Sequence, residues 1–124
     1  CTTNLKSDLK VVKFAKKTNI PFYCGSSKNK ILRISECCKK YNIETFHTID
    51  ADDPFFDGEE MHLSMRTLRE GNFDVVNPTI SSSNGGASVG YSIKSKILES
   101  LKILINFLYF GKRLILSSVA SAIG

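Results

Sequence analysis

Two kinds of hydrophobic pattern alternate along this chain. In the first, apolar residues recur at helical spacing among lysines and other polar residues, which predicts amphipathic helices. In the second, short runs of aromatic and β-branched residues end at Pro, Gly or Asn, which predicts strands. The helices are expected around residues 9–15, over 30–41 and over 58–69, and the strands at 21–24, 44–49 and 73–76.

Polar residues flank the predicted helices at positions that suit helix ends. Ser7 or Asp8 is a candidate N-cap of the first helix and Asp57 of the third, because short polar side chains accept hydrogen bonds from the first backbone amides. Asn19 and Asn42 follow the first and second helices and are expected to end them.

The second half of the chain continues the alternation. After residue 76 we expect a Ser/Gly-rich loop at 81–86, a strand at 87–91, a buried helix at 95–109 and a last strand at 113–119. Because strands and helices alternate with short connections, the sequence predicts a single α/β domain, 1–124, with a three-layer, mainly parallel sheet.

The charge balance limits the classes of partner. The chain has 124 residues and a formal net charge of +5, with lysines spread over helical faces at 6–17 and 28–40. This charge suits anionic ligands such as nucleotides. It is too small and too dispersed to predict a nucleic-acid-binding protein, and most of these lysines are interpreted as solvated surface residues.

The cysteines and the apolar segment 101–123 bear on the cellular compartment in which the protein is expected. Cys1, Cys24, Cys37 and Cys38 show neither a CxxC pair nor zinc-ligand spacing, so we interpret them as reduced thiols of a cytoplasmic protein. The segment 101–123 is apolar, but charged and amide residues interrupt it before any run reaches the roughly 18 residues of a membrane helix. A membrane protein is therefore not predicted.

The most distinctive chemistry lies where the strand at 44–49 ends. Asp50, Asp52 and Asp53 follow it directly, and Pro54 then stops the strand. In an α/β sheet this strand end lies at the edge where ligands bind. Carboxylates there suit Mg²⁺, which proteins often hold with one or two acids plus substrate phosphates. The alternative is an Asp-rich turn without a metal, because Asp favours turns through local hydrogen bonds.

Several other polar residues have both a functional and a structural interpretation. Lys28 and Lys30 could contact a phosphate or could be ordinary surface lysines. The segment 81–90 could line a sugar pocket with its backbone, Ser and Asn groups, or could be a flexible linker. His47 and His62 have no evident nucleophile partner, and we interpret both as structural.

Four segments, taken in order, resemble one enzyme family. They are Cys1-Thr2-Thr3-Asn4 with Ser7-Asp8, then 22–26 with 29–33, then 49–57, and finally 71–76. Their order and spacing are similar to those of the cytidylyltransferases, which include CMP-sialic acid synthetases and spore-coat polysaccharide biosynthesis enzymes. Residues 49–57 resemble the strand of that family that ends in Gly-Asp-x-Pro-Leu-Ile-Asp. The resemblance covers the chain from Cys1 to about Leu101.

The resemblance implies a Rossmann-like nucleotide-diphospho-sugar transferase fold, present in part. It also implies transfer of CMP from CTP to a sugar or sugar acid, with release of pyrophosphate and Mg²⁺ as cofactor. Asp52 aligns with the family's metal-binding Asp, and Arg33 aligns with an arginine near the nucleotide, although a surface ion pair is an alternative role for Arg33. Asp50 replaces a usually uncharged residue and could be a second metal ligand or only a rim residue. Ser26 and Lys28, with Arg33, are the expected nucleotide contacts, and Asp52 and Arg33 the expected catalytic residues.

The chain departs from the family pattern at both ends. The family's Gly-rich, basic phosphate loop would precede Cys1, and residues 102–124 offer no candidate for a later metal-binding acid. We therefore expect an incomplete enzyme that does not turn over substrate alone. A nucleotidyltransferase or glycosyltransferase of the same fold that uses another nucleotide is a second interpretation. A non-catalytic α/β association module, assembled as a homodimer through the apolar tail, is a third.

Overall fold

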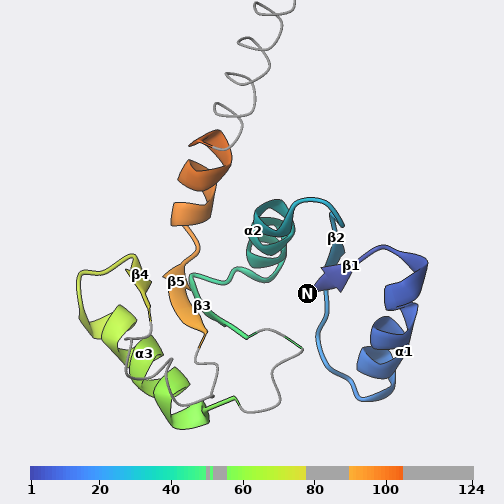
Figure 1. Cartoon of the computed structure of the whole chain (residues 1–124), viewed down its shortest axis with the longest axis horizontal. Helices are drawn as coiled ribbons and strands as arrows, with labels where there is room; N and C mark the ends of the chain where they lie inside the picture. The colour runs from blue at the N-terminus through green and yellow to red at the C-terminus, as the bar shows by residue number, and fades with distance from the viewer. Residues whose placement is uncertain (50, 52–55, 78–89, 105–124) are drawn as a thin grey trace, which may run out of the picture. The chain divides into compact units, whose positions relative to one another are not determined.

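The computed structural model describes residues 1–49, 51, 56–77 and 90–104. These residues form a mixed α/β structure with one small parallel sheet and one small antiparallel sheet (Figure 1). The elements in chain order are β1 (Thr2–Thr3), the 3-10 helix η1 (Lys6–Asp8), α1 (Leu9–Lys17), β2 (Cys24–Gly25), α2 (Lys30–Tyr41), β3 (Thr45–Thr48), α3 (Gly58–Glu70), β4 (Val75–Val76) and β5 (Tyr91–Lys94). A further helical segment occupies positions 97–104.

Two compact units make up the described chain. The first consists of Cys1–Glu36 with the described residues from Leu98 onward, and it contains the parallel pair β1–β2. The second consists of Cys37–Ile97 and contains a three-stranded sheet in the order β3-β5-β4. Strand β5 runs antiparallel to both of its neighbours. Helix α2 is continuous through the boundary between Glu36 and Cys37.

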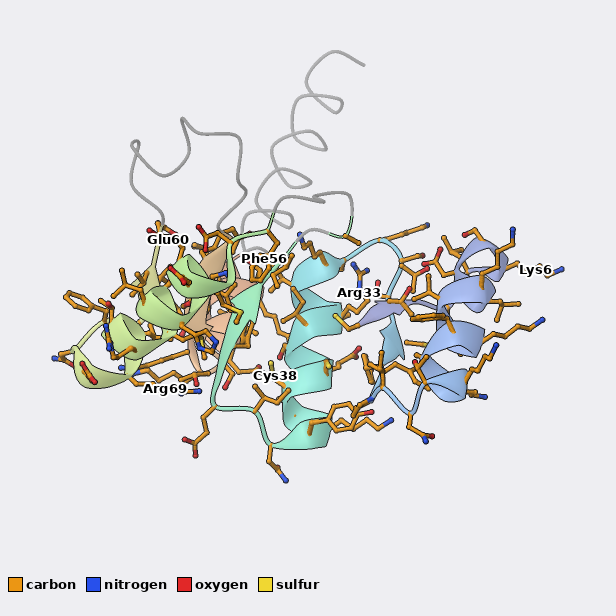
Figure 2. All side chains as sticks on the ribbon, turned by 90° about the horizontal axis from the view of Figure 1, so that it is seen from below. Lys6, Arg33, Cys38, Phe56, Glu60 and Arg69 are labelled. Carbon is orange, nitrogen blue, oxygen red and sulfur yellow. The ribbon has the colours of Figure 1, made fainter. Side chains whose placement is uncertain are left out.

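The three helices predicted before residue 70 are confirmed, whereas positions 105–109 of the fourth lie outside the described residues. Helix α2 spans the expected residues 30–41, and α3 extends the expected 58–69 by one residue. The Asp57 carboxylate accepts hydrogen bonds from the backbone amides of Glu59 (2.9 Å) and Glu60 (3.2 Å), which is the N-cap geometry expected of it. Glu60 lies in the first turn of α3 and Arg69 in the last, so both charges interact favourably with the helix dipole (Figure 2).

Asparagines end the first two α-helices in the left-handed conformation. Asn19 and Asn42 have φ angles of 54° and 52°. The amides of the next residues, Ile20 and Ile43, each donate at 2.9 Å to the carbonyl five residues earlier. This is the Schellman arrangement, and Asn adopts it more readily than most residues because its short polar side chain tolerates positive φ. Both predicted helix ends are therefore confirmed.

Helix α3 provides the core of the second unit, because it packs across β3, β4 and β5 (Figure 1). Leu68 on this helix and Ser92 on the central strand β5 are both fully buried. The hydroxyl groups of Ser92 and Ser64 lie 2.8 Å apart, so the face of β5 that carries Ser92 is the one that α3 covers. The core therefore lies between one helix and one face of a three-stranded sheet.

The strand pairing differs from the mainly parallel sheet expected from the sequence. Among the described strands, only β1 and β2 pair in parallel, whereas β3 and β4 each pair antiparallel with β5. Strands β3 and β4 run in the same direction, but β5 lies between them. The alternation of strands and helices could not predict this insertion, because it depends on contacts between residues far apart in the sequence.

Two strand positions also differ from the prediction. The strand expected at 21–24 lies instead at Cys24–Gly25, and Pro21, which has no N–H group to donate, lies outside it. The strand expected at 87–91 begins at Tyr91 and continues to Lys94, so the following helix begins at 97 instead of 95. The expected strand at 113–119 lies outside the described residues. Within the described ranges, no helix has both the length and the apolar content needed to cross a membrane.

Candidate functional site

The carboxyl ends of β3 and β4 lie at one edge of the second sheet. Thr48, the last residue of β3, is opposite Tyr91, and Val76, the last residue of β4, is opposite Ser92. Strand β5 therefore begins at this edge, immediately after Gly90. The segments 50–55 and 78–89 are joined to described residues here, and they carry the predicted carboxylates and the Ser/Gly-rich sequence.

The predicted metal ligands lie outside the described residues. Asp50 and Asp52, together with the neighbouring Asp53, therefore remain predictions that follow from their place in the sequence after β3. Within the described part of the chain, no three His, Cys, Asp or Glu side chains gather closely enough to hold a metal ion. The described strand β3 ends at Thr48, shortly before these acids in the sequence.

Gly90 makes the close approach of β5 to β3 possible at this edge. Its φ angle is 59°, in the region that side chains with a Cβ atom rarely adopt. A Cβ atom at position 90 would overlap the Thr48 carbonyl oxygen and would lie 2.8 Å from Nε2 of His47. Glycine is therefore required here for two reasons, its backbone conformation and the lack of space.

His47 belongs to a hydrogen-bonded cluster that the sequence did not reveal. Its Nδ1 atom lies 2.8 Å from the hydroxyl of Ser92, and that hydroxyl lies 2.8 Å from the hydroxyl of Ser64 on α3. The imidazole also lies 6.3 Å from the Phe56 ring, centroid to centroid. Ser92 is 45 positions from His47, so only the strand register brings the two together.

Arg33 lies on α2 in the first unit, and its side chain folds back onto the turn that precedes this helix. Its Nη1 donates a hydrogen bond to the carbonyl oxygen of Ser26, and its side chain leaves α2 on the side of that turn (Figure 2). The Nε atom of Arg33 is buried and has no hydrogen-bond partner in the described part of the chain. A Cβ atom added to Gly25 would lie 2.7 Å from the Tyr23 ring and 2.9 Å from Cγ of Arg33. Glycine at 25 thus allows Arg33 to pack closely on the turn.

Ser26 has a local structural role in this turn. Its hydroxyl accepts a hydrogen bond from the amide of Asn29 (3.1 Å), and the Asn29 side chain in turn accepts one from the amide of Leu32 (2.9 Å). Asn29 is thus the N-cap of α2. Lys28 lies exposed in the same turn. Ser26 and Lys28 thus lie in the turn that precedes α2, and Arg33 contacts this turn from the helix; their role as nucleotide contacts stays a prediction.

Asp8 connects the end of β1 to the helices that follow. Its carboxylate accepts hydrogen bonds from the hydroxyls of Thr2 (3.1 Å), Thr3 and Ser7 (3.0 Å), and from the amide of Thr3 (3.3 Å). These bonds, that of the Thr3 hydroxyl above all, lower the pKa of Asp8 below its usual value. Asp8 occupies the N-cap position of α1, as expected, but its side chain caps no amide of that helix.

Cys38 is a thiol in the core of the fold. It is buried, and burial together with the neighbouring Cys37 raises its pKa, so it remains a protonated thiol at neutral pH. None of the four cysteines forms a disulfide. A thiolate nucleophile is therefore not available at Cys38.

The outer face of α3 carries a shallow depression of about 570 Å³. Its described lining combines acidic, basic and apolar side chains of one helix: Glu59, His62, Leu63, Met65, Arg66, Arg69 and Glu70. The predicted contacts Ser26, Lys28 and Arg33 are not part of it. Because its charges are mixed and do not converge, this depression is not the candidate site.

The two candidate regions are the strand edge beside Gly90 and the turn held by Arg33. No protein-family model, curated protein or solved structure matches this chain. The functional assignment therefore depends on the residues and on the geometry of these two regions.

Proposed function

We propose that this chain is a nucleotide-binding α/β domain of the cytidylyltransferase type, with the nucleotide-diphospho-sugar transferase fold in part. Its nucleotide is CTP, its acceptor is a sugar or sugar acid, and its compartment is the cytoplasm. The observation that carries the proposal is the common edge of the β3-β5-β4 sheet. Strands β3 and β4 both end there, and the segments with Asp50, Asp52 and the Ser/Gly-rich sequence are joined to it. Ligands of α/β proteins bind at the carboxyl ends of strands.

The turn at the start of α2 supports the proposal independently. A helix N-terminus favours anions, and a guanidinium group binds phosphate oxygens through several donors at once. Arg33 uses Nη1 on the Ser26 carbonyl, and its Nε donor has no partner among the described residues. The bond to the Ser26 carbonyl thus fixes the guanidinium beside the helix start.

The proposed reaction is displacement at the α-phosphorus of CTP. An oxygen of the acceptor forms the new bond, the bond to the bridging oxygen of the β-phosphate breaks, and pyrophosphate leaves. The protein's task is to position the two reactants and to stabilise the added negative charge. Asp52, with Asp50, is the proposed ligand of Mg²⁺, which when bound would neutralise phosphate charge.

Thermal melting with nucleotides tests the proposal. A ligand that binds only the native state raises stability by about 2.7 kcal/mol when its concentration is a hundred times Kd. We expect a Mg²⁺-dependent increase in Tm with CTP that exceeds the increase with UTP or GTP. Asp52→Asn should abolish the Mg²⁺ dependence, whereas Asp53→Asn, the neighbouring acid, should retain it. Equal shifts with all three nucleotides would favour another nucleotidyltransferase or glycosyltransferase.

A non-catalytic association module is the second candidate, and the surface of the first unit favours it. Leu9, Val11 and Phe14 on α1 are 49%, 56% and 62% exposed, which is high for large apolar side chains on an ordered helix. This candidate predicts assembly that increases with concentration in sedimentation velocity, including homodimers, and no effect of any nucleotide on Tm. A folded monomer that responds to CTP would eliminate it.

A further inference from the structure

The exposed surface of η1 and α1 is strongly basic. Helix α1 contains no acidic residue, and Asp8, which precedes it, directs its carboxylate to the hydroxyls of Thr2, Thr3 and Ser7. Five exposed lysines of this surface have no ion-pair partner in the described part of the chain: Lys6, Lys10, Lys13, Lys16 and Lys17. The surface is therefore a patch of unpaired positive charge.

Four of these lysines form one row, here called the lysine ridge: Lys6, Lys10, Lys13 and Lys17. They follow one another at intervals that alternate between four and three positions, and this spacing repeats one face of a helix. Successive residues of an α-helix are about 100° apart, so Lys13 and Lys17 each lie about 160° from Ala15, which is buried. Lys6, in η1, points outward from the helical segment (Figure 2). The lysine ridge therefore lies opposite the buried side of α1 and faces solvent.

Large apolar side chains are exposed on both flanks of the lysine ridge. Leu9 and Phe14 are both exposed on α1, and their positions differ by about 140° around the helix, with the ridge between them. Leu5 and Ile20, before and after the helical segment, are exposed as well. Groups of exposed apolar side chains mark surfaces that bind a partner or a membrane. The partner of this surface must therefore offer both negative charge and apolar contact.

An anionic lipid surface meets both requirements. Leu9 and Phe14 point in different directions, so one groove of a partner protein would not take both, whereas the fluid headgroup layer of a membrane surrounds a helix and accepts both. A nucleic-acid backbone would match the lysines but would leave the apolar side chains in water. A second copy of α1 would bring two sets of lysines together, and like charges across an interface repel.

We propose that the lysine ridge binds the surface of a membrane that contains anionic lipids, with Leu9 and Phe14 entering the headgroup region. The helix lies on this surface and does not span the membrane. Each lysine near an anionic leaflet strengthens binding by roughly fivefold, and its apolar stem packs beside the apolar side chains. The inference does not depend on the proposed nucleotide chemistry, because none of these residues belongs to the proposed nucleotide site.

Co-sedimentation of the full chain with lipid vesicles tests the proposal. Vesicles of equal parts phosphatidylcholine and phosphatidylserine should bind the protein, and vesicles of phosphatidylcholine alone should bind it at least about tenfold more weakly. Added salt should weaken the binding, because the screening length falls from about 10 Å at 0.1 M to about 3 Å at 1 M. Equal binding to both kinds of vesicle, or no binding to either, would overturn the proposal.

Paired substitutions locate the binding on α1. Lys10→Gln combined with Lys13→Gln should weaken binding to the mixed vesicles by roughly 30-fold, and Phe14→Ala by at least about threefold. The matched control combines Arg66→Gln with Arg69→Gln, which removes the same charge from exposed positions of α3 and should bind like the wild type. An unchanged Tm shows that each variant is folded. Equal losses in the two double variants would mean that net charge alone attracts the protein, and the assignment to α1 would be wrong.

Other partners of the lysine ridge predict different results. If the folded wild type does not bind the mixed vesicles but binds polyglutamate or single-stranded RNA, the ridge serves an acidic protein or a nucleic acid, and the proposal is wrong. Dimers in sedimentation velocity that Phe14→Ala abolishes, without vesicle binding, would assign the surface to a second copy of the chain and would also overturn it. The effect of CTP on Tm is a separate measurement, so failure of the proposed function and failure of this inference are distinguishable.

Discussion

The two units of this protein bury their helices to different extents. In the second unit, α3 packs across all three strands, and Leu68 and Ser92 have no exposed surface. In the first unit, β1 and β2 contain two residues each, and large apolar side chains of α1 such as Phe14 remain exposed. Both helices are amphipathic in sequence, so periodicity alone does not show which apolar face is covered. The second unit has a core between α3 and its sheet, whereas at the start of the first unit the Asp8 carboxylate accepts hydrogen bonds from Thr2, Thr3 and Ser7.

Truncating one leucine to alanine in each unit should give the largest difference in the free energy of unfolding. Leu68→Ala removes a fully buried side chain and should lower the free energy of unfolding by about 2–5 kcal/mol. Leu9→Ala removes the same atoms from a residue that is 49% exposed, and it should change the free energy of unfolding by about 0.5 kcal/mol or less. Urea unfolding measures both. Equal losses would mean that α1 is as well packed as α3.

The edge of the second sheet should be sensitive to a single methyl group. Gly90→Ala forces a Cβ atom against the Thr48 carbonyl at a φ of 59°, and we expect a loss of about 1–3 kcal/mol in urea unfolding. The control is Gly58→Ala at the start of α3, where a Cβ atom would meet nothing within 4 Å. That variant should be neutral or stabilised by up to about 1 kcal/mol. A Gly90→Ala variant as stable as the wild type would disprove the close approach of β5 to β3.

Asp8 and Asp57, the acids that precede α1 and α3, should contribute to stability through different hydrogen bonds. Asp57→Ala leaves two helix amides without their acceptor and should cost about 1 kcal/mol in chemical denaturation. Asp57→Asn keeps an acceptor oxygen and should recover most of this loss. If the alanine and asparagine variants were equally stable, the carboxylate would not act as a cap.

The Asp8 carboxylate should make the stability of the first unit sensitive to acid, and this is the smallest of the four expected effects. The Thr3 hydroxyl and the other donors hold the folded-state pKa below 3.8, so the stabilisation is present above pH 3.8 and is lost as the pH falls below it. Asp8→Asn should therefore flatten the pH dependence of Tm in that acidic range. Parallel wild-type and variant profiles below pH 4 would show that the Asp8 hydrogen bonds do not contribute to stability.

The sequence predicted the helices and their ends because these depend on neighbours within one or two turns. Asp57, Asn19 and Asn42 each act on amides or carbonyls a few residues away, and all three occupy the expected positions. The turn with Ser26 and Arg33 is also local, since the two residues are separated by seven positions. The sequence likewise identified the strand end that precedes Asp50.

Only the tertiary structure decided how the strands pair and what surrounds His47. The insertion of β5 between β3 and β4, the required glycine at 90 and the contact with Ser92 all join residues that are far apart in the chain. Such contacts form only when long loops close and a sheet register is selected by packing, and neither is encoded in the period of a short segment. Local hydrogen-bonding preferences can be read from adjacent residues, whereas the relation between distant segments depends on the free energy of the whole fold.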